Sequence, residues 1–588
     1  MSADASPYTG EPPAEVDLVV VGSGAAGLTA AVTAAAHGLA VVVVEKDTVC
    51  GGATAWSGGW IWVPCNPLSR AEGVAEDVGA ARTYLEHELG REFDAPRVDA
   101  LLEHGPAMVA FLESRTTLQF VSGTAIADIH GDTPGAGTGG RSVAPKPYDA
   151  RGMDPALFAI TRAQKPETAL LGMGIMAGPD LHRFLHATRS LRAFAHVARR
   201  LGRHVLDLAV RGRSLQLVNG TALVARLLVS ADALGVAIRV STPVIGLARD
   251  GAAVRGVEVV SGGRRTTIRV RRGVVLAAGG FPHDRARRSA LIERLPGGGE
   301  AWALPPEAVD GDGIRLGESA GGRLATDVAS PVAWCPVSVV PYRDGAAGLH
   351  PHIVDRGKPG VIGVLADGRR FCNEADGYHD YVSAMLAAIP PGREVASWLV
   401  CDHAFLRRYP FGMAKPFPVP LRPWLANGYL QRGTTIAALA RACGIDAAGL
   451  VATLDGYNRH ARRGEDPAFG RGRTRFNRGS GDPDHGPNPC VAPIEKAPFY
   501  AIKVLPGSFG TFAGLATDAQ ARVLDAVGAP IDGLYAVGCD QASVMGGHYP
   551  SGGINLGPAM TFGYVAGRHA AGGRAPVGAP SQRDPSGL

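Results

Sequence analysis

The chain has 588 residues, of which 80 are glycine, and it carries a formal net charge of +5. This length exceeds the usual size of a single hydrophobic core, so we expect two domains. A charge of +5 spread over such a length, with no basic block interleaved with aromatic residues, gives no support for nucleic-acid binding.

The N-terminal segment and the cysteines indicate where in the cell we expect the protein. Met1–Glu15 is polar and lacks a basic segment followed by an apolar core, so we expect a disordered tail over residues 1–14 and no secretory signal. The eight cysteines are scattered without CxxC pairs or metal-ligand spacing, which predicts reduced thiols, a cytoplasmic location and no metal site. The most apolar long window is interrupted by glycines and His37, which argues against an integral membrane segment.

A βαβ unit follows the tail, and it organises the prediction. Asp17–Val21 and Ala40–Val44 read as buried parallel strands, and Leu28–His37 reads as the helix between them. The glycines between strand and helix permit a tight turn, close approach of a pyrophosphate and close helix–strand packing. An acid at the end of the second strand is placed to accept from ribose hydroxyls. The predicted nucleotide-binding residues are Gly22, Ser23, Gly24, Ala25, Ala26, Gly27, Glu45 and Lys46.

A second loop of small residues comes soon after this unit. Two such loops so close together favour a ligand longer than a mononucleotide, which indicates noncovalently bound FAD. Its predicted contacts are Gly51, Gly52, Ala53, Thr54, Ser57, Gly58 and Gly59. Later glycine-rich strand ends and turns add further predicted FAD contacts at Val244, Ala278, Gly279, Gly280, Gly538, Asn555 and Leu556.

The elements that surround these loops are predicted from hydrophobic periodicity. Helices are expected at Ala75–Leu89, Arg97–Glu113 and Thr221–Leu234, and strands at Val236–Val240, Val244–Leu247, Val254–Val260, Thr266–Val270 and Gly273–Ala278. Arg151–Ala177 reads as irregular. Asp180–Leu215 reads as one or two amphipathic helices whose arginines lie on the outer face.

From about Glu300 prolines multiply and periodicity weakens, which predicts a second domain. The fold class is α/β: a Rossmann-like FAD-binding domain over residues 15–299 and 498–575, with an inserted α+β capping domain over 300–497 and a disordered tail over 576–588. Within this part we expect helices at Thr435–Cys443, Ala447–Arg463 and Ala559–Ala571, a loop at Gly464–Pro493, and strands from Phe499 and over Gly533–Gly538.

The chain resembles the flavoproteins related to fumarate reductase and succinate dehydrogenase, and within them the 3-ketosteroid dehydrogenases. The resemblance rests on Val21–Gly27, Gly51–Gly59, Asp367–Glu374, Gly510–Asp518 and Gly533–Arg568. Fumarate-reducing relatives place an arginine proton donor after the motif that ends here at Glu374, whereas this chain offers Tyr378. A site without such cations does not readily hold a dianion, so a neutral, hydrophobic cyclic ketone is expected as substrate.

The resemblance implies catalytic roles by motif position. Tyr549 and the N–H of Gly553 would bind the ketone oxygen, and Tyr378 would take the α-proton. Ser551 is an alternative proton acceptor. The tyrosine that supports the base in the family is replaced here by Ile129, so the histidines His379, His130 and His548 are alternative helpers. Arg369 and Glu374 are interpreted as an internal charge pair.

The resulting prediction is an FAD-dependent dehydrogenase that introduces a C=C bond beside a ring ketone, in the manner of a 3-ketosteroid Δ1-dehydrogenase, with its electron acceptor left open. Alternatives within the class are a 3-keto-5α-steroid Δ4-dehydrogenase or a cyclohexanone-type dehydrogenase. A flavin-dependent reductase of enones or fumarate would run in the opposite direction. An electron-transfer flavoprotein subunit, making a peripheral membrane contact through the arginines of 180–215, is a further alternative.

Overall fold

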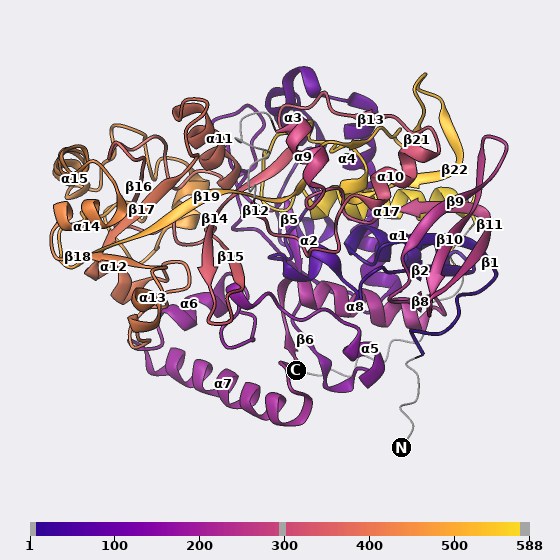
Figure 1. Ribbon diagram of the computed structural model, residues 1–588, viewed down its shortest axis with the longest axis horizontal. Coiled ribbons are helices and arrows are strands. Elements are labelled where there is room, and N and C mark those ends of the chain that lie inside the picture. The colour runs from indigo at the N-terminus through magenta and orange to yellow at the C-terminus, as the bar shows by residue number, and fades with distance from the viewer. Residues whose placement is uncertain (1–6, 293–301, 575, 577–588) are drawn as a thin grey trace.

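Two β-sheets set the architecture of the chain (Figure 1). The computed structural model describes residues 7–292, 302–574 and 576. The predicted tail residues 1–6, the domain boundary at 299–300 and all but residue 576 of the predicted C-terminal tail lie outside the described residues.

The first sheet has eight strands, and its central strands are parallel. Its main path runs β21-β22-β11-β1-β2-β8, and β10 and β9 extend it as an antiparallel ribbon from β11. The strands are β1 (Glu15–Val21), β2 (Val41–Val44), β8 (Ala237–Arg239), β9 (Val244–Asp250), β10 (Ala253–Ser261), β11 (Arg264–Leu276), β21 (Arg522–Leu524) and β22 (Pro530–Ala536). All four residues of β2 are buried valines, as expected of a parallel strand that is covered on both faces.

Helices cover this sheet at close range. Every residue of α1 (Ala25–Ala36) is buried, and α1 packs along α17 (Leu556–Ala570). A Cβ at Gly563 would lie 2.5 Å from the carbonyl oxygen of Ala26, so glycine is needed where the two helix backbones meet. The other covering helices are α4 (Ala95–Arg115) and α8 (Asn219–Ala233).

The second sheet has seven strands that pair mostly antiparallel. Its path runs β15-β14-β19-β17-β16, with β12 and β18 also pairing with β19. The strands are β12 (Trp302–Ala303), β14 (Val332–Pro341), β15 (Ala347–Pro351), β16 (Val361–Val364), β17 (Ser397–Asp402), β18 (Gln431–Gly433) and β19 (Phe499–Thr511). Its helices are α11 (Tyr378–Ala388), α12 (His403–Arg408), α13 (Arg422–Ala426), α14 (Ile436–Cys443), α15 (Ala447–Ala461) and α16 (Arg475–Ser480).

Further α-helices and strands connect and flank the two sheets. They are α2 (Pro67–Ala71), α3 (Val78–Leu89), α5 (Pro155–Ala159), α6 (Pro179–Leu185), α7 (Leu191–Arg211), α9 (Arg285–Leu291), α10 (Asp312–Ser319), β3 (Ile61–Trp62), β4 (Phe120–Ser122), β5 (Ser142–Pro145), β6 (Tyr148–Asp149), β7 (Gln216–Leu217), β13 (Leu324–Ala325) and β20 (Gly514–Leu515).

The predicted βαβ unit and α/β class are confirmed, and the differences have local causes. The strands predicted at 266–270 and 273–278 are one strand, β11, because Gly273 adopts a φ of 141° where the register against β1 shifts. The loop predicted at 464–493 contains α16, and the irregular stretch at 151–177 contains α5. In the predicted N-terminal tail, Tyr8 is buried and its carbonyl accepts a hydrogen bond from Val240 N at 3.0 Å.

The strand predicted from Phe499 forms β19, the centre of the second sheet. In turn, α10 contributes Ile314 and Leu316 to the core of the first sheet. The second sheet thus draws on β12 at 302–303 and on the part of β19 beyond residue 497, whereas α10 at 312–319 packs on the first sheet, and the bounds 300–497 stay a prediction.

The arginines of α7 are not all on its outer face, contrary to the prediction, because Arg200 and Arg203 are partly buried in ion pairs with Asp180 and Asp149. Leu191 and Val210 are 89% and 73% exposed, whereas His204 and Asp207 are buried. The helix is amphipathic, as its periodicity indicates, but it turns its apolar side outward.

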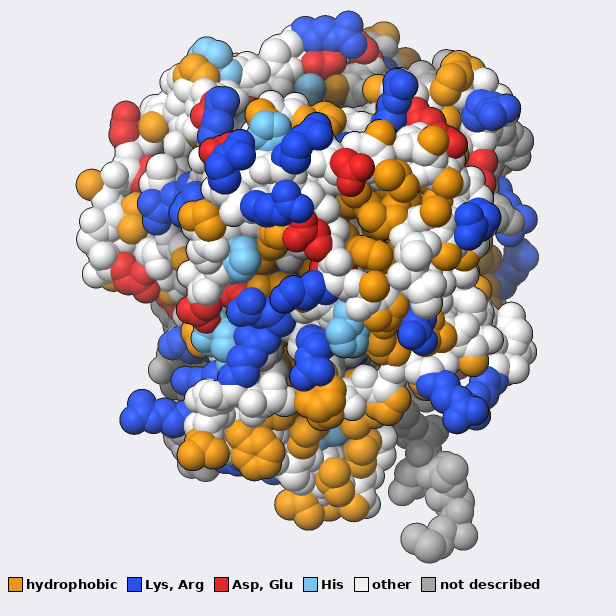
Figure 2. Space-filling model, turned by 90° about the vertical axis from the view of Figure 1, so that its left-hand side faces the viewer, with side chains coloured by type: hydrophobic (Ala, Val, Ile, Leu, Met, Phe, Trp, Pro, Cys, Tyr) orange, Lys and Arg blue, Asp and Glu red, His pale blue; other side chains and the backbone are white. Residues whose placement is uncertain are grey.

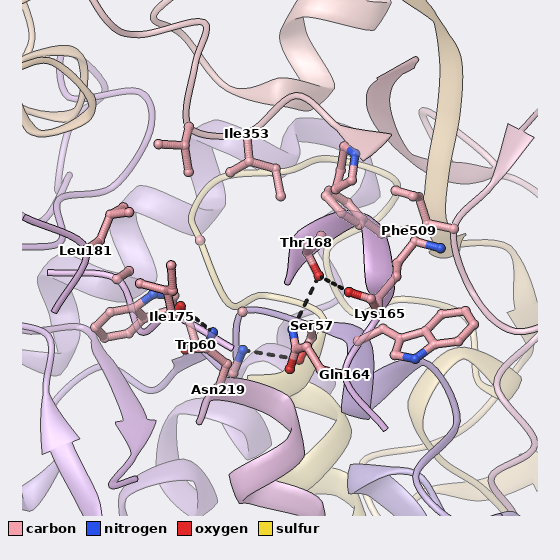
Figure 3. A pocket seen from close by; sticks show the side chains of 18 of the residues that line it. Ser57, Trp60, Gln164, Lys165, Thr168, Ile175, Leu181, Asn219, Ile353 and Phe509 are labelled. Atoms are coloured by element: carbon pink, nitrogen blue, oxygen red, sulfur yellow. Dashed lines mark hydrogen bonds between the residues drawn. The ribbon is translucent and has the colours of Figure 1, made fainter. Parts of the chain in front are cut away.

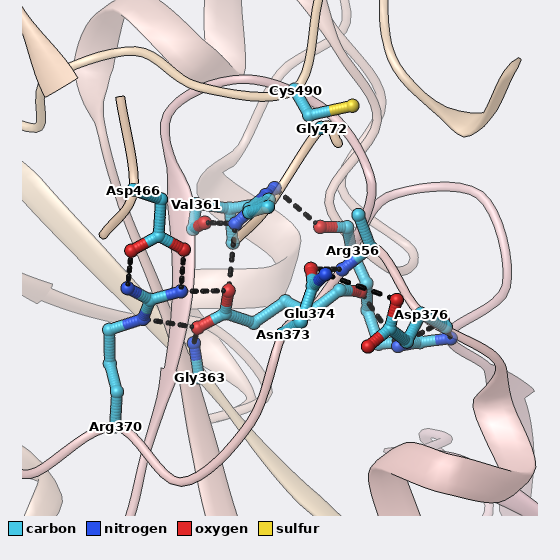
Figure 4. Close-up of polar contacts among 12 residues, drawn as sticks. Arg356, Val361, Gly363, Arg370, Asn373, Glu374, Asp376, Asp466, Gly472 and Cys490 are labelled. Carbon is cyan, nitrogen blue, oxygen red and sulfur yellow. Dashed lines mark hydrogen bonds and ion pairs between the residues drawn. The ribbon is translucent and has the colours of Figure 1, made fainter. Parts of the chain in front are cut away.

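A buried ion network ties together the loops of the second sheet (Figure 4). The Glu374 carboxylate accepts from Arg370 Nε at 2.8 Å, Arg471 Nη1 at 3.0 Å and Gly363 N at 3.0 Å. Burial alone raises the pKa of Glu374, but the two arginines lower it overall. The partner of Glu374 is thus Arg370, and the predicted pair with Arg369, which is exposed, is wrong.

Replacing Glu374 with Gln leaves two buried guanidinium groups short of negative charge, so we expect a loss of about 3–5 kcal/mol in unfolding free energy. Urea denaturation followed by circular dichroism measures the loss. Arg369→Gln is the matched control and should cost less than about 0.5 kcal/mol, because its side chain is exposed. Equal effects of the two substitutions would contradict the assigned role of the network.

Candidate active site

One cavity of about 1560 Å³ connects the two sheets. Its walls come from the β1–α1 turn, the second glycine-rich loop, the start of α11 and the loop before α17. Figure 3 shows part of the wall, where Ser57, Trp60, Lys165, Ile175, Ile353 and Phe509 surround the space. The volume exceeds the roughly 300–1,000 Å³ of a pocket for one small ligand, so the cavity has room for a cofactor together with a substrate.

The β1–α1 turn has the geometry of a dinucleotide-binding turn. Gly22 has a φ of 104°, and a Cβ there would overlap the carbonyl oxygen of Ala277. A Cβ at Gly27 would overlap the carbonyl oxygen of Gly22, so this glycine permits close helix–strand packing. No side chain caps α1 at Gly24, and Gly24–Ala26 line the cavity, so the positive end of a helix dipole faces the space.

The carboxylate at the end of β2 is held in place by the same turn. Glu45 Oε2 accepts from Ser23 N at 3.1 Å and from Ser23 Oγ, and Oε1 accepts from Asp47 N at 2.9 Å. The neighbouring Lys46 pairs with Asp310 at 2.7 Å and Asp312 at 2.8 Å. Burial alone lowers the pKa of Lys46, but these two carboxylates raise it overall, so its ammonium stays charged at the cavity wall.

The second glycine-rich loop packs against α8 and reaches back to α1. Thr54 Oγ1 accepts from Ala25 N at 2.9 Å. A Cβ at Gly59 would lie 2.7 Å from the carbonyl carbon of Asn219, and Asn219 in turn donates to Ile175 O at 3.0 Å (Figure 3). The loop is thereby held along the cavity, next to the nucleotide-binding turn.

A buried carboxyl that the sequence prediction missed supports the cavity wall next to the β1–α1 turn. Asp540 accepts from Ala278 N at 2.6 Å and from Gly280 N at 2.8 Å. Burial raises the pKa of Asp540 to about 6, against the opposing effect of these backbone amides. It fixes the glycine turn after β11. In the sequence, only the position of Asp540 just after the predicted strand end at Gly538 could have indicated its role.

Most predicted site residues meet in this cavity. The cofactor candidates that line it are Gly22, Ser23, Gly24, Ala25, Ala26, Glu45, Lys46, Gly52, Ala53, Thr54, Ser57, Gly58, Gly59, Val244, Ala278, Gly279, Gly538, Asn555 and Leu556. Gly27, Gly51 and Gly280 lie behind the wall, where they permit tight turns or packing. Tyr378, Tyr549 and Gly553 line the cavity, and Ser551 does not.

Two phenols meet at the end of the cavity away from the β1–α1 turn. The rings of Tyr378 and Tyr549 lie 4.8 Å apart, nearly perpendicular to each other, and Phe509 packs 5.1 Å from Tyr378. Asn555 Nδ2 donates to the Tyr549 hydroxyl oxygen at 3.1 Å. The Tyr549 proton is thereby directed to a different acceptor, which in this structure is the hydroxyl oxygen of Tyr378. Phe509 lies in an apolar strand, so the sequence could not distinguish it from an ordinary core residue.

The two phenols differ in their electrostatics. Burial raises the pKa of both. The hydrogen bond between their hydroxyls opposes that rise at Tyr378 and adds to it at Tyr549. The shared hydrogen bond therefore makes Tyr378 the more easily deprotonated of the two hydroxyls.

The loop before α17 presents a backbone donor beside these phenols. Gly553 has a φ of 98°, and a Cβ there would lie 2.8 Å from Trp62 N. Its carbonyl accepts from Trp62 N at 3.1 Å and from Gly557 N at 2.8 Å, while no described residue accepts from its own N–H. A glycine is required at this position, and its amide is available to a ligand.

The other candidates for proton transfer lie outside the cavity lining. Ser551 is 1% exposed and its hydroxyl binds the buried carboxylate of Asp128. His130 contacts Glu88 and Asp380, and His548 lies 3.5 Å from Glu92. Burial lowers the pKa of His379 to about 4, and its Nδ1 accepts from Trp334 N at 3.2 Å.

Ile129 packs beside the residue that precedes Tyr378. Its Cγ2 would lie 3.2 Å from a Cβ at Gly377, and its N donates to Pro550 O at 3.0 Å. Ile129 thus brings no hydroxyl to Tyr378, and the hydroxyl that interacts with Tyr378 is that of Tyr549.

The fold, the helix N-terminus at the cavity and the carboxylate after β2 together define a dinucleotide-binding flavoprotein. Comparison with known proteins agrees. A family model described as an FAD binding domain matches residues 17–556. The 4-oxocyclohex-2-ene-1-carboxylate 5-dehydrogenase of Sinomonas cyclohexanicum is 40% identical over 94% of this chain and 93% of its own length.

Two further relatives come from sequence and from structure. A 3-oxosteroid 1-dehydrogenase of Mycobacterium tuberculosis is 36% identical, covering 95% of this chain and 98% of its own. The crystal structure of the 3-ketosteroid Δ1-dehydrogenase of Sterolibacterium denitrificans with 1,4-androstadiene-3,17-dione matches with a TM-score of 0.86 and 35% identity, over 95% of this chain and all of that one.

The chain belongs to the FAD-binding flavoprotein family that contains the 3-oxosteroid 1-dehydrogenases. It is an FAD-dependent dehydrogenase that acts on CH–CH bonds, and the predicted cofactor is confirmed. The residues fit FAD: the open helix N-terminus would hold the pyrophosphate, Glu45 would face the ribose, and the loop 51–59 would lie along the remainder.

The steric demand at Gly22 yields a direct test. Gly22→Ala places a methyl group against Ala277 in a backbone conformation that costs an L-residue about 1–2 kcal/mol by itself, so we expect FAD retention to fall about tenfold or more. The flavin-to-protein absorbance ratio of purified protein measures it. Gly10→Ala is the control, since a Cβ at Gly10 meets nothing within 4 Å, and circular dichroism establishes folding of both. Full flavin content in Gly22→Ala would contradict the assigned turn.

Proposed function

We propose that the protein removes two hydrogens from the carbon pair beside a ring ketone, with Tyr378 as the proton acceptor and Tyr549 and the Gly553 N–H as donors to the ketone oxygen. The observation that carries the proposal is the Tyr378–Tyr549 pair in the cavity, 4.8 Å apart and oriented by Asn555. When bound, FAD supplies the acceptor for the hydride that leaves the β-carbon.

The roles follow from where charge develops. An α-C–H is a weak acid, so its proton leaves only if the oxygen of the forming enolate is stabilised. Asn555 fills one acceptor position of Tyr549 and directs the Tyr549 proton away from itself, while Gly553 offers an unused N–H. Two preorganised donors in a largely apolar cavity stabilise that oxygen more strongly than water does. The proton passes to the oxygen of Tyr378, which must first have lost its own proton to act as the base.

Two substrate classes are compatible with this site. A polycyclic ketone such as a steroid is supported by the cavity volume, by the aromatic walls Trp56, Trp60 and Phe509, and by the steroid dehydrogenases among the relatives. A monocyclic oxo-carboxylate is the second candidate, because the Lys415 ammonium also lines the cavity. The Lys415 Nζ atom donates to Gly412 O at 3.5 Å, and no described carboxylate lies within 4 Å of Nζ.

Rates with 4-androstene-3,17-dione and with 4-oxocyclohex-2-ene-1-carboxylate separate these classes. Lys415→Met should raise KM for the carboxylate and leave the steroid unaffected. Anaerobic mixing should bleach the oxidised flavin with the true substrate class. A flavin that stays oxidised with every ketone, and whose reduced form is reoxidised by enones, would instead establish the reductase alternative.

Tyr549→Phe removes one donor to the developing oxyanion. We expect kcat to fall by about 10²–10³ while FAD content stays constant, since the hydroxyl acts on the substrate and not on the cofactor. Tyr500→Phe is the matched control, because Tyr500 lies in β19 and does not line the cavity. A loss in Tyr549→Phe of less than about threefold would remove Tyr549 from the reaction.

The raised pKa of Tyr378 sets the direction of the pH dependence. The base acts only after it loses its proton, and burial raises its pKa above the ordinary value, so kcat/KM should increase with pH across the alkaline range. The slope of log kcat/KM should be near +1 between about pH 7 and 9. Tyr549→Phe, which removes the opposing hydrogen bond, should move the rise to higher pH. A profile that falls above pH 7 would exclude a phenolic base.

A further inference from the structure

The helix α7 is inverted relative to an ordinary surface helix. Its exposed side chains include Leu191 (89%), Phe194 (61%), Val205 (63%), Leu206 (66%) and Val210 (73%). Successive 100° turns place the first four of these on one face. Figure 2 shows hydrophobic side chains gathered along the lower edge of the molecule, where α7 lies, with Lys and Arg side chains beside them.

Polar contacts on the opposite face lock this orientation. Asp180 accepts from His196 Nε2 and Arg200 Nη1, each at 2.7 Å. His204, which is buried, contacts Leu171 O at 2.9 Å through Nε2, and Asp207 accepts from Leu215 N at 3.1 Å. The helix cannot rotate its apolar face inward without breaking these bonds, so the face needs an external partner.

The charge around this face is strongly positive. Residues 180–213 contain eight arginines and two acidic residues, and both acids are engaged on the inner side. Arg183, Arg189, Arg192, Arg199 and Arg211 are exposed, and none forms an ion pair with a described residue. A second copy of the same face would bring these like charges together, whereas an anionic surface would neutralise them.

The apolar face continues into the active-site cavity. The cavity is lined on this side by Leu181, Phe184 and Leu185 around α6 and by Phe194, Val197 and Leu201 of α7. Phe194 belongs both to this lining and to the exposed face. The outer apolar face of α7 and the cavity lining therefore meet at Phe194.

We propose that α7 lies in the interface of an anionic lipid bilayer, with Leu191, Val205 and Leu206 inserted among the acyl chains and the flanking arginines at the headgroups. The ring ketone then enters the cavity from the membrane between α6 and α7, a route that rests on the proposed function. An amphipathic helix of low overall hydrophobicity with arginines at its border is suited to lying in that plane. No helix among the described residues is long and apolar enough to cross a membrane.

Sedimentation with vesicles tests the docking. The FAD-loaded protein should bind phosphatidylcholine vesicles that contain about 30% phosphatidylglycerol, and bind them less as salt rises. The double substitution Val205→Asp and Leu206→Asp should reduce the bound fraction about tenfold or more. The matched control is Val527→Asp, which alters an 87% exposed valine far from α7 in sequence and outside the cavity lining. Arg192→Glu with Arg199→Glu should abolish the preference for anionic over neutral vesicles.

Two results would overturn the docking: a wild-type protein that does not bind these vesicles, or a dimer by light scattering that the Val205/Leu206 substitution dissociates.

The entry route of the ketone has its own readout. The double variant should match wild type with a ketone dispersed in detergent-free buffer and lose rate at least about tenfold with the ketone loaded in vesicles. Equal rates with loaded vesicles would refute the route. Vesicle binding without turnover of any ketone would refute the proposed function and leave the docking intact.

Discussion

The contact between Tyr378 and Tyr549 requires the two sheet units to keep a fixed relative position. Tyr378 begins α11, which packs on the second sheet, and Tyr549 precedes α17, which packs against α1 on the first. The two rings meet only if both sheet units hold their positions, because each phenol is supplied by a different unit. A hydrogen-bonded pair of buried phenols also gives the two hydroxyls different proton affinities, which a single tyrosine in the same cavity would not have.

The loops that deliver these residues are held by buried polar contacts. Arg356 donates to the carbonyl oxygen of Glu374 at 2.8 Å, and the Glu374 side chain is bound by Arg370 and Arg471. This network lies in the segment that leads directly to Tyr378. In the loop before α17, Asn555 positions Tyr549, and Gly553 packs against the backbone of Trp62. Breaking a buried ion pair is costly, so this network holds the segment before Tyr378 in place.

The nucleotide-binding end follows a different principle. There the turns approach so closely that side chains are excluded, and the amides of α1 face the cavity. The same cavity then extends past aromatic walls to an apolar helix whose outer face needs a partner. A water-poor cavity strengthens the hydrogen bonds expected to act on the ketone, and an opening toward lipid would keep such a cavity from filling with solvent.

The sequence by itself determined the features that depend on near neighbours in the chain. The βαβ unit, its glycines, Glu45 and the identity of the cofactor were predictable, because strand, turn and helix follow within about thirty residues. The steric demand on Gly27 comes from Gly22 nearby, whereas that on Gly22 comes from Ala277, far along the chain. The positions of Tyr378, Tyr549 and Gly553 came from resemblance to a family, and the structure brings them to one cavity without testing their roles.

Tertiary structure alone decided the remainder. Periodicity identified α7 as amphipathic but carries no information about which face meets the protein. Ion pairs of Arg200 with Asp180 and of Arg203 with Asp149, both outside α7, decided it. Adjacent arginines 369 and 370 are equivalent in sequence, and only the packing of the loop placed Arg370 on Glu374. Asp540, Phe509 and the burial of Ser551 likewise depend on segments far apart in the chain, whose meeting no local pattern records.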